Sequence, residues 1–320
     1  ILENASPLIK VTIIPRGKSL GAAWYLPEGG YVVAYNEEEA LRLAREKSHN
    51  SNLTIADLRQ DEDCLDTWFS SWLWPISLFD GINHPGNPEI NYYYPTNDLV
   101  TGPDIIFFWV ARMIMAGYEY EGKMPFKNVY FTGIVRDKLG RKMSKSLGNS
   151  PDPLDLIDKY GADALRWYLL YVSPPWTPIR FDESGLREIQ SKFIGTIKNV
   201  YNFFALYANM DDVNPTDFFV EYKDRPELDR WILSRFNHLK KETEENLEIF
   251  EVNKTIRSIQ AFINDDLSNW YIRRSRRRFW ATELTEDKKA VYNTTYELLT
   301  GLCRLIAPFA PYMSEEMYRD

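Results

Sequence analysis

Residues 128–149 read NVYFTGIVRDKLGRKMSKSLGN, and this stretch decides the fold of the chain around it. A β-branched and aromatic run opens it and predicts a buried strand ending near Val135. A basic loop bounded by Gly140 and Gly148 follows, and the prolines after it predict the start of a helix. In open α/β sheets, ligands bind at loops that leave the carboxyl ends of strands. The order of strand, basic loop and helix therefore predicts an anion site.

The residue types of this loop fit a polyphosphate. Lys142 and Lys145 bring two ammonium groups, and Ser144 and Ser146 bring hydroxyl donors beside the backbone N–H groups. Such donors can together form a phosphate cradle. A solvated basic turn is the alternative for an arbitrary pair of lysines three residues apart. The complete string KMSKS in this context favours a triphosphate.

Composition limits the class of protein. The chain has 320 residues, 44% of them hydrophobic and 15% aromatic, which predicts a globular protein with room for two cores. Its net charge of −8 predicts no general attraction to nucleic acid, so any such contact needs a local basic patch.

Cysteine usage and hydropathy bear on the compartment. Cys64 and Cys303 are far apart and lack CxxC spacing, which predicts free thiols in a reducing compartment. The apolar run around Ile105 to Val110 is too short to cross a bilayer, and we expect no signal peptide. We therefore expect a cytoplasmic protein.

The hydrophobic periodicity changes along the chain. Strand and helix patterns alternate in the first half, and from residue 185 the pattern is almost all helical, which predicts an α/β region followed by an all-α region. Residues 1–26 suggest a strand pair, 27–58 a strand, a helix with an acidic start and a polar loop, and 97–117 a strand, a turn and a helix. The polar loop 211–227 suggests a domain boundary. The domains that we expect are 1–26, 27–58, 59–184 and 185–320.

Three segments carry a family resemblance: DCLDTWFSSWLWPIS (63–77), YPTNDLVTGPDIIFFWVARMI (94–114) and the lysine loop with the helix after it. Together they make residues 27–165 similar to the valyl members of the class I aminoacyl-tRNA synthetases, whose second signature is KMSKS. The resemblance implies the second half of a Rossmann-like nucleotide-binding fold. It also implies ATP-dependent activation of valine to an aminoacyl-adenylate and transfer to tRNA, with Mg²⁺ accompanying the nucleotide.

The resemblance also implies residue roles. Lys142 and Lys145 would be catalytic, because cations must meet the negative charge that spreads onto the leaving pyrophosphate. The family's G-x-D motif corresponds to Gly102–Pro103–Asp104, and the alternative role for Asp104 is a helix N-cap. The alternative for the pocket residues Trp68 and Ile105 is burial in a core. The implied ATP-binding residues are Met143, Ser144, Ser146, Gly102 and Asp104, and the implied amino-acid pocket residues are Trp68 and Ile105.

Part of the family pattern is absent from the sequence. None of the three histidines, His49, His84 and His238, stands in the family's first signature, H-x-G-H. The large editing insertion is also absent, although residues 25–44 resemble its exit. We therefore expect that an N-terminal half is missing and that the chain alone does not activate an amino acid.

Two further resemblances make the sequence read as a composite. Residues 1–26 are similar to a piece of the membrane-bound ATP-dependent zinc proteases, but without H-E-x-x-H, so we predict no metal site. Beyond Asp163–Arg166, the sequence resembles the isoleucyl synthetases. The alternatives to a valine enzyme are thus an isoleucine enzyme or a tRNA-binding fragment without catalysis.

The segment LSNWYIRRSRRRFW (267–280) is the local basic patch. At helical spacing its aromatic side chains can pack inward while most arginines face outward. Arginine pairs with phosphates and aromatic rings stack on unpaired bases, which favours RNA. A solvated helix face balanced by Glu283 and Glu286 is the alternative. The segment resembles the anticodon-binding bundle of class I synthetases, here truncated, and implies contact with a valine or isoleucine tRNA. The predicted tRNA-binding residues are Arg273, Arg274, Arg276, Arg277 and Trp270.

Overall fold

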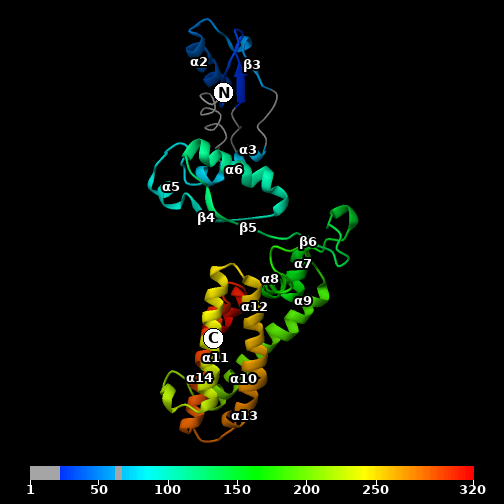
Figure 1. The fold of residues 1–320 in the computed structure, drawn as a ribbon, viewed down its shortest axis with the longest axis vertical. Coiled ribbons are helices and arrows are strands. Elements are labelled where there is room, and N and C mark those ends of the chain that lie inside the picture. The colour runs from blue at the N-terminus through cyan, green and yellow to red at the C-terminus, as the bar shows by residue number, and fades with distance from the viewer. Residues whose placement is uncertain (1–21, 62–66) are drawn as a thin grey trace. The chain divides into compact units, whose positions relative to one another are not determined.

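The structure is a computed structural model that describes residues 22–61 and 67–320. The chain divides into two compact units, residues 1–131 and 132–320 (Figure 1). Most of the strand pair expected within 1–26, and with it most of the protease-like segment, lies outside the described residues.

The first unit begins with a small antiparallel sheet of strand order β2-β1-β3. Its strands are β1 (Ala22–Tyr25), β2 (Tyr31–Ala34) and β3 (Arg59–Gln60). Helix α2 (Glu37–Ser48) packs on β2 and is capped by Asn36, whose side chain accepts a hydrogen bond from the Glu39 N–H. A 3-10 turn, η1 (Ile55–Asp57), precedes β3. The strand, acidic-start helix and polar loop predicted for 27–58 are confirmed.

A parallel strand pair and its connecting helix form the next part of the first unit. Strand β4 (Thr96–Thr101) pairs with β5 (Phe126–Phe131), with Thr96 opposite Phe126. Between them runs a helical connection of four consecutive segments: η2 (Pro103–Ile105), η3 (Ile106–Val110), α6 (Ala111–Ala116) and η4 (Gly117–Glu121). Three short helices precede this β-α-β unit: α3 (Thr67–Trp72), α4 (Trp74–Ser77) and α5 (Pro88–Tyr93). The strand, turn and helix predicted for 97–117 are confirmed.

The strand predicted to run from residue 128 to Val135 is wrong as a single element. Strand β5 ends at Phe131, and β6 (Val135–Arg136) pairs in parallel with β7 (Ile179–Arg180) of the second unit. The cause is a close backbone approach at Gly133, whose N–H donates to Pro175 O at 2.6 Å. A Cβ on Gly133 would lie 1.9 Å from Thr177 O, so only glycine fits there. The boundary between the two units falls inside the predicted strand.

Helices make up most of the second unit, as predicted. They are η5 (Lys145–Leu147), α7 (Pro153–Tyr160), α8 (Ala162–Tyr171), α9 (Glu183–Ile189), η6 (Gln190–Ile194), α10 (Gly195–Met210), η7 (Tyr222–Asp224), α11 (Glu227–Glu248), α12 (Val252–Ala261), η8 (Phe262–Ile272), α13 (Arg273–Phe279), α14 (Glu286–Ile306) and α15 (Pro311–Arg319). Helix α7 is capped by Asp152, whose side chain accepts a hydrogen bond from the Leu154 N–H, and Gly161 at φ 88° separates α7 from α8. Helices α10, α11, α12 and α14 lie alongside one another in a bundle (Figure 1).

One hydrophobic core joins the helices on both sides of residue 184. Trp167 of α8 is fully buried, stacks on Phe193 of η6 at 3.8 Å between ring centroids, and donates to Gln260 Oε1 at 2.9 Å. The boundary expected at 184/185 therefore lies inside the second unit. The loop 211–227 also belongs to this unit, because Asn293 of α14 donates to Phe218 O at 3.0 Å.

Candidate functional site

The lysine loop, defined as residues 136–149, leaves the carboxyl end of β6, which runs parallel to β7. Its first part is a tight hairpin in which Lys142 pairs with Arg136 in an antiparallel bridge. The hairpin closes through Gly140 N–H, which donates to Asp137 O at 2.8 Å. Gly140 has a φ of 81°, a conformation that favours glycine. This is the position after a parallel strand at which α/β sheets bind ligands.

Asp137 is the centre of this hairpin and is only 7% exposed. Its Oδ1 accepts from Leu139 N at 3.0 Å and from Arg141 N at 2.8 Å. Its Oδ2 accepts from Arg141 Nε at 2.7 Å and from Asn149 Nδ2 at 3.0 Å. The hydrogen bond from Asn149, followed by those from Arg141, lowers the pKa of Asp137 to about 2 against the opposing effect of burial. The side chain is therefore a carboxylate at neutral pH.

Asn149 closes the loop from its other end. Its Oδ1 accepts from Ser144 N at 2.9 Å, and its Nδ2 also donates to Lys142 O at 3.2 Å. Lys142 is thus fixed through its backbone while its side chain is exposed. Met143 is half-buried and packs against the core of the second unit, which anchors the loop.

The predicted serines lie side by side. Ser144 Oγ is 3.2 Å from Ser146 Oγ and also accepts from Leu147 N at 3.3 Å. The backbone of Lys145 begins the short turn η5, and its side chain lies outside what the structure describes. Sequence reasoning missed Asp137 and Asn149, although an Asp that opens a turn ending in Gly is a common turn signal.

Asp104, the residue predicted to bind the ribose, belongs to the first unit. Gly102 is the N-cap residue of η2, so Asp104 is inside the first turn and the N-cap interpretation of Asp104 is wrong. The Asp104 carboxylate folds back toward Gly102, where an added Cβ would lie 2.8 Å from Asp104 Oδ1. Asp104 is exposed, and no described residue donates a hydrogen bond to its carboxylate. Its oxygens can therefore accept hydrogen bonds from a ligand.

The predicted amino-acid pocket residues lie on neighbouring elements of the same unit. Trp68 of α3 stacks on Phe108 of η3, with 5.7 Å between ring centroids and 28° between planes. Helix η3 begins directly after Ile105. Trp68 and Ile105 are both half-buried rather than core residues, and Phe107 beside them is 82% exposed. The lysine loop belongs to the other unit.

The arginine-rich segment divides as the helical spacing predicts. Arg273, Arg274, Arg276 and Arg277 are exposed, and none of them forms an ion pair within the described part of the chain. Arg274 lies over the ring of Trp270 at 4.6 Å, and that ring is 48% exposed. This face offers cations and an aromatic surface together.

Arg278 of the same run points inward and has a structural role. Its Nη1 donates to Asp229 Oδ1 at 2.6 Å, and its Nη2 donates to Asp229 Oδ2 at 2.8 Å. Tyr271 donates to the same carboxylate at 2.9 Å, and complete burial, followed by the Asp229 charge, raises its pKa.

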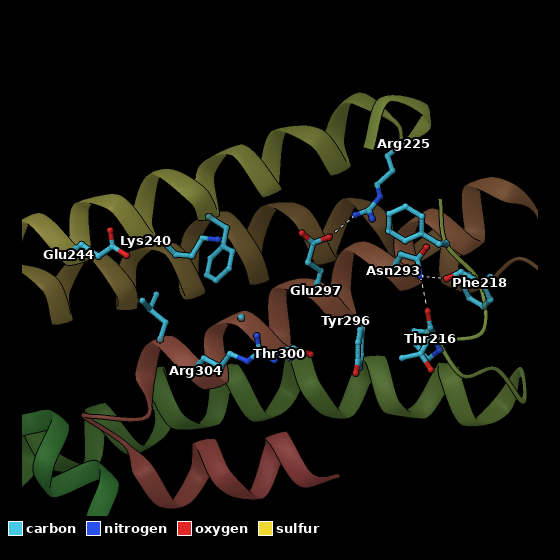
Figure 2. Close-up of a pocket in the computed structure, with 15 residues that line it drawn as sticks. Thr216, Phe218, Arg225, Lys240, Glu244, Asn293, Tyr296, Glu297, Thr300 and Arg304 are labelled. Atoms are coloured by element: carbon cyan, nitrogen blue, oxygen red, sulfur yellow. Dashed lines mark hydrogen bonds and ion pairs between the residues drawn. The ribbon is translucent and has the colours of Figure 1, made fainter. Parts of the chain in front are cut away.

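A cavity of about 720 Å³ opens in the helical bundle between α11, α14 and the loop before η7 (Figure 2). At one end the buried Arg225 donates to Glu297 at 3.0 Å, and Asn293 holds the loop through Pro215 O and Phe218 O. At the other end Lys240 lies over the Phe236 ring. None of its lining residues was predicted as a site residue. We place the candidate site at the lysine loop, because the exposed Lys142 side chain follows a parallel strand and forms no ion pair with any described residue.

The described ranges, 22–61 and 67–320, hold neither a metal-ligand cluster nor a helix that could span a membrane. No three His, Cys, Asp or Glu side chains gather there as metal ligands. No helix there combines the length and apolar character that crossing a bilayer requires.

Comparison with known sequences assigns both parts of the chain. Residues 23–182 match the family described as tRNA synthetases class I (I, L, M and V), and residues 229–320 match the anticodon-binding domain of tRNA ligase. The valine–tRNA ligase of Bacteroides thetaiotaomicron is 51% identical over 298 residues, which are 93% of this chain and 33% of that protein. The isoleucine–tRNA ligase of Porphyromonas gingivalis is 37% identical over 292 residues, 89% of this chain and 26% of that protein. The chain spans about a third of the length of the valine ligases that it matches.

Comparison with solved structures supports the fold. The Agrobacterium radiobacter K84 agnB2 LeuRS, solved with tRNA and LeuAMS, has a TM-score of 0.70 at 22% identity and aligns with 94% of this chain and 40% of its own. Methionyl-tRNA synthetase of Mycobacterium tuberculosis has a TM-score of 0.62 at 19% identity and aligns with 82% of this chain and 50% of its own. The expected Rossmann-like region followed by an anticodon-binding bundle is thereby confirmed.

Proposed function

This chain belongs to the class I tRNA synthetases of the isoleucine, leucine, methionine and valine group, and from that membership we propose that it is part of a valine–tRNA ligase. The observation that carries the choice of valine is the 51% identity to a valine ligase against 37% to an isoleucine ligase. Both alignments cover about nine-tenths of the chain, so they include the nucleotide region and the bundle alike. The alternative of an isoleucine enzyme is the weaker one.

In the proposed reaction, a carboxylate oxygen of valine bonds to the α-phosphorus of ATP and the bond to the leaving pyrophosphate breaks. Negative charge then grows on the phosphates that leave. Lys142 and Lys145 would stabilise that charge, and the hydroxyl groups of Ser144 and Ser146 would donate to the phosphate oxygens. These roles are supported by the adjacent serine hydroxyls and by the exposed side chain of Lys142, which forms no ion pair with any described residue. Met143 would hold the loop in place through its contact with the core.

The first unit would hold the rest of the substrates. Asp104 would accept hydrogen bonds from the ribose hydroxyls, since its carboxylate is exposed, and Gly102 would leave room for that carboxylate. Trp68 and Ile105 would wall the valine side chain. An apolar wall rejects a larger side chain by clash but discriminates a missing methylene by only about 1–3 kcal/mol.

Mg²⁺ would arrive with the nucleotide. Within the described residues no protein group of three or more ligands is available for it, and Mg²⁺ commonly binds through substrate phosphates. When bound, it would neutralise phosphate charge beside the lysines.

The bundle would bind tRNA through Trp270 and the four exposed arginines. This role is supported by their lack of ion pairs among the described residues and by the family match of 229–320. A second candidate function is tRNA binding without amino-acid activation. That candidate is favoured by the absence of an H-x-G-H sequence from this chain.

The test of tRNA binding compares retention of valine and isoleucine tRNAs by the chain at two salt concentrations. We expect tighter retention of valine tRNA. The salt slope, which is the slope of the logarithm of the binding constant against the logarithm of the salt concentration, should fall in magnitude by about one when one phosphate-contacting arginine, such as Arg277, becomes Ala. Arg42→Ala, which removes an exposed arginine of the first unit, is the matched control and should leave the slope unchanged. Equal retention of both tRNAs with an unchanged slope in Arg277→Ala would contradict the proposal.

A further inference from the structure

The lysine loop carries five cationic side chains, Arg136, Lys138, Arg141, Lys142 and Lys145. The side chain of Arg141 forms an ion pair, with its Nε 2.7 Å from Asp137 Oδ2. Asp137 is the less exposed partner of this pair. Lys142, the next residue, forms no ion pair with any described residue and is exposed. Neighbouring cations of one loop thus have different roles: one holds the loop together, and the other faces solvent.

The backbone on both sides of Lys142 is held by two side chains. Asp137 accepts from Arg141 N at 2.8 Å, and Asn149 accepts from Ser144 N at 2.9 Å. Asn149 also donates to Lys142 O at 3.2 Å and to Asp137 Oδ2 at 3.0 Å, which links the two clamps. A group held in this way can be presented to a ligand without first losing backbone freedom.

We propose that Asp137 is a positioning residue of the lysine loop: with Asn149 it fixes the backbone of Lys142 and retains Arg141, so that Lys142 is the cation presented to the phosphates. This inference rests on the proposed function, since it assumes a polyphosphate at the loop. The carboxylate form is needed because both oxygens act only as acceptors. An asparagine at position 137 would set its NH₂ group against the donors of Arg141 or Asn149.

The first measurement tests the clamp itself by limited trypsin digestion of the chain, scored at Arg141 and Lys142. We expect Asp137→Asn and Asn149→Ala to raise the cleavage rate about tenfold, because cleavage requires the loop to open. Asp152→Asn is the matched control. It removes the same charge 15 residues further along the chain, and asparagine caps a helix as well as aspartate does. Its cleavage rate should stay within about twofold of the original chain.

The second measurement tests positioning through calorimetric binding of inorganic tripolyphosphate. Lys142→Ala and Asp137→Asn should each weaken binding about five- to tenfold, and Arg141→Ala less than about twofold. The direction in which Asp137→Asn changes the affinity for tripolyphosphate is diagnostic. Removing a negative charge strengthens general attraction to an anion, so weaker binding cannot come from the charge change and is the result expected when the loop no longer holds Lys142 in place. Asp152→Asn gives the size of the general charge effect.

Three results would overturn the inference in distinguishable ways. Unchanged cleavage in Asp137→Asn would show that the clamp does not hold the loop. Faster cleavage with binding that is unchanged or tighter would leave the phosphate role of Lys142 intact and reduce Asp137 to a structural role. Binding by the original chain no tighter than by Lys142→Ala would remove the proposed phosphate role of the loop, and the positioning role with it.

Discussion

The buried ion pair of Asp229 and Arg278 offers a sharp test of what holds the helical bundle together. Asp229 is 0% exposed, and it receives two hydrogen bonds from Arg278 at 2.6 and 2.8 Å and one from Tyr271 at 2.9 Å. The same guanidinium contacts a second carboxylate, Asp287, at 3.0 Å, whose side chain is 51% exposed. One arginine therefore has a buried partner and an exposed one.

The substitution Asp229→Asn keeps the shape and removes the charge. Its NH₂ group would face the guanidinium donors, and a mostly buried cation would lose its buried counterion. Breaking a buried pair from one side costs about 3–5 kcal/mol. Asp287→Asn removes the exposed partner and should cost only about 0–1 kcal/mol.

Urea unfolding followed by far-UV ellipticity measures both variants, since most helical residues lie in the second unit. With an m value of about 2 kcal/mol/M, Asp229→Asn should lower the midpoint by about 1.5–2.5 M, and Asp287→Asn by less than about 0.5 M. Equal shifts of the urea midpoint for the two variants would refute the reasoning, because burial would then not decide how much each ion pair contributes to the free energy of unfolding.

Three further predictions follow from other parts of the chain. The 320-residue chain alone should show no valine-dependent pyrophosphate exchange; exchange clearly above a Lys145→Ala control would contradict this. Gly133→Ala places a Cβ 1.9 Å from Thr177 O, so it should lower the free energy of unfolding by about 1–3 kcal/mol in urea titrations, and a neutral effect would show that residues 174–178 do not pack there. The pKa of Asp137 is lowered from its ordinary 3.8 to about 2. Its contribution to the stability of the lysine loop is therefore complete above pH 3.8 and is lost as the pH falls through about 2. Hydrogen exchange of the Leu139 and Arg141 amides, corrected for intrinsic rate, should therefore show protection at pH 4, and loss of protection already at pH 5 would be inconsistent with this pKa.

Local patterns in the sequence were sufficient for most elements and for the lysine loop. The strand, turn and helix within 97–117, the helix start at the prolines after the lysine loop and the helical second half were all predicted, because turns, proline positions and periodicity depend on residues a few positions apart. The loop was found from KMSKS, where the chemistry of lysine and serine is readable without coordinates. The role that each loop residue plays in binding stays a prediction.

Contacts between distant segments decided the rest. The strand predicted to reach Val135 breaks because residues 174–178, some forty positions later, press against Gly133. Likewise, Trp167 and Phe193 share a core across the expected boundary at 184, and Arg278 turns toward Asp229 while its neighbours stay exposed. The sequence by itself determined which short segments are helices, strands and a phosphate-suited loop. Only tertiary structure decided where units divide and which charges are free, since both depend on which residues far apart in the chain meet.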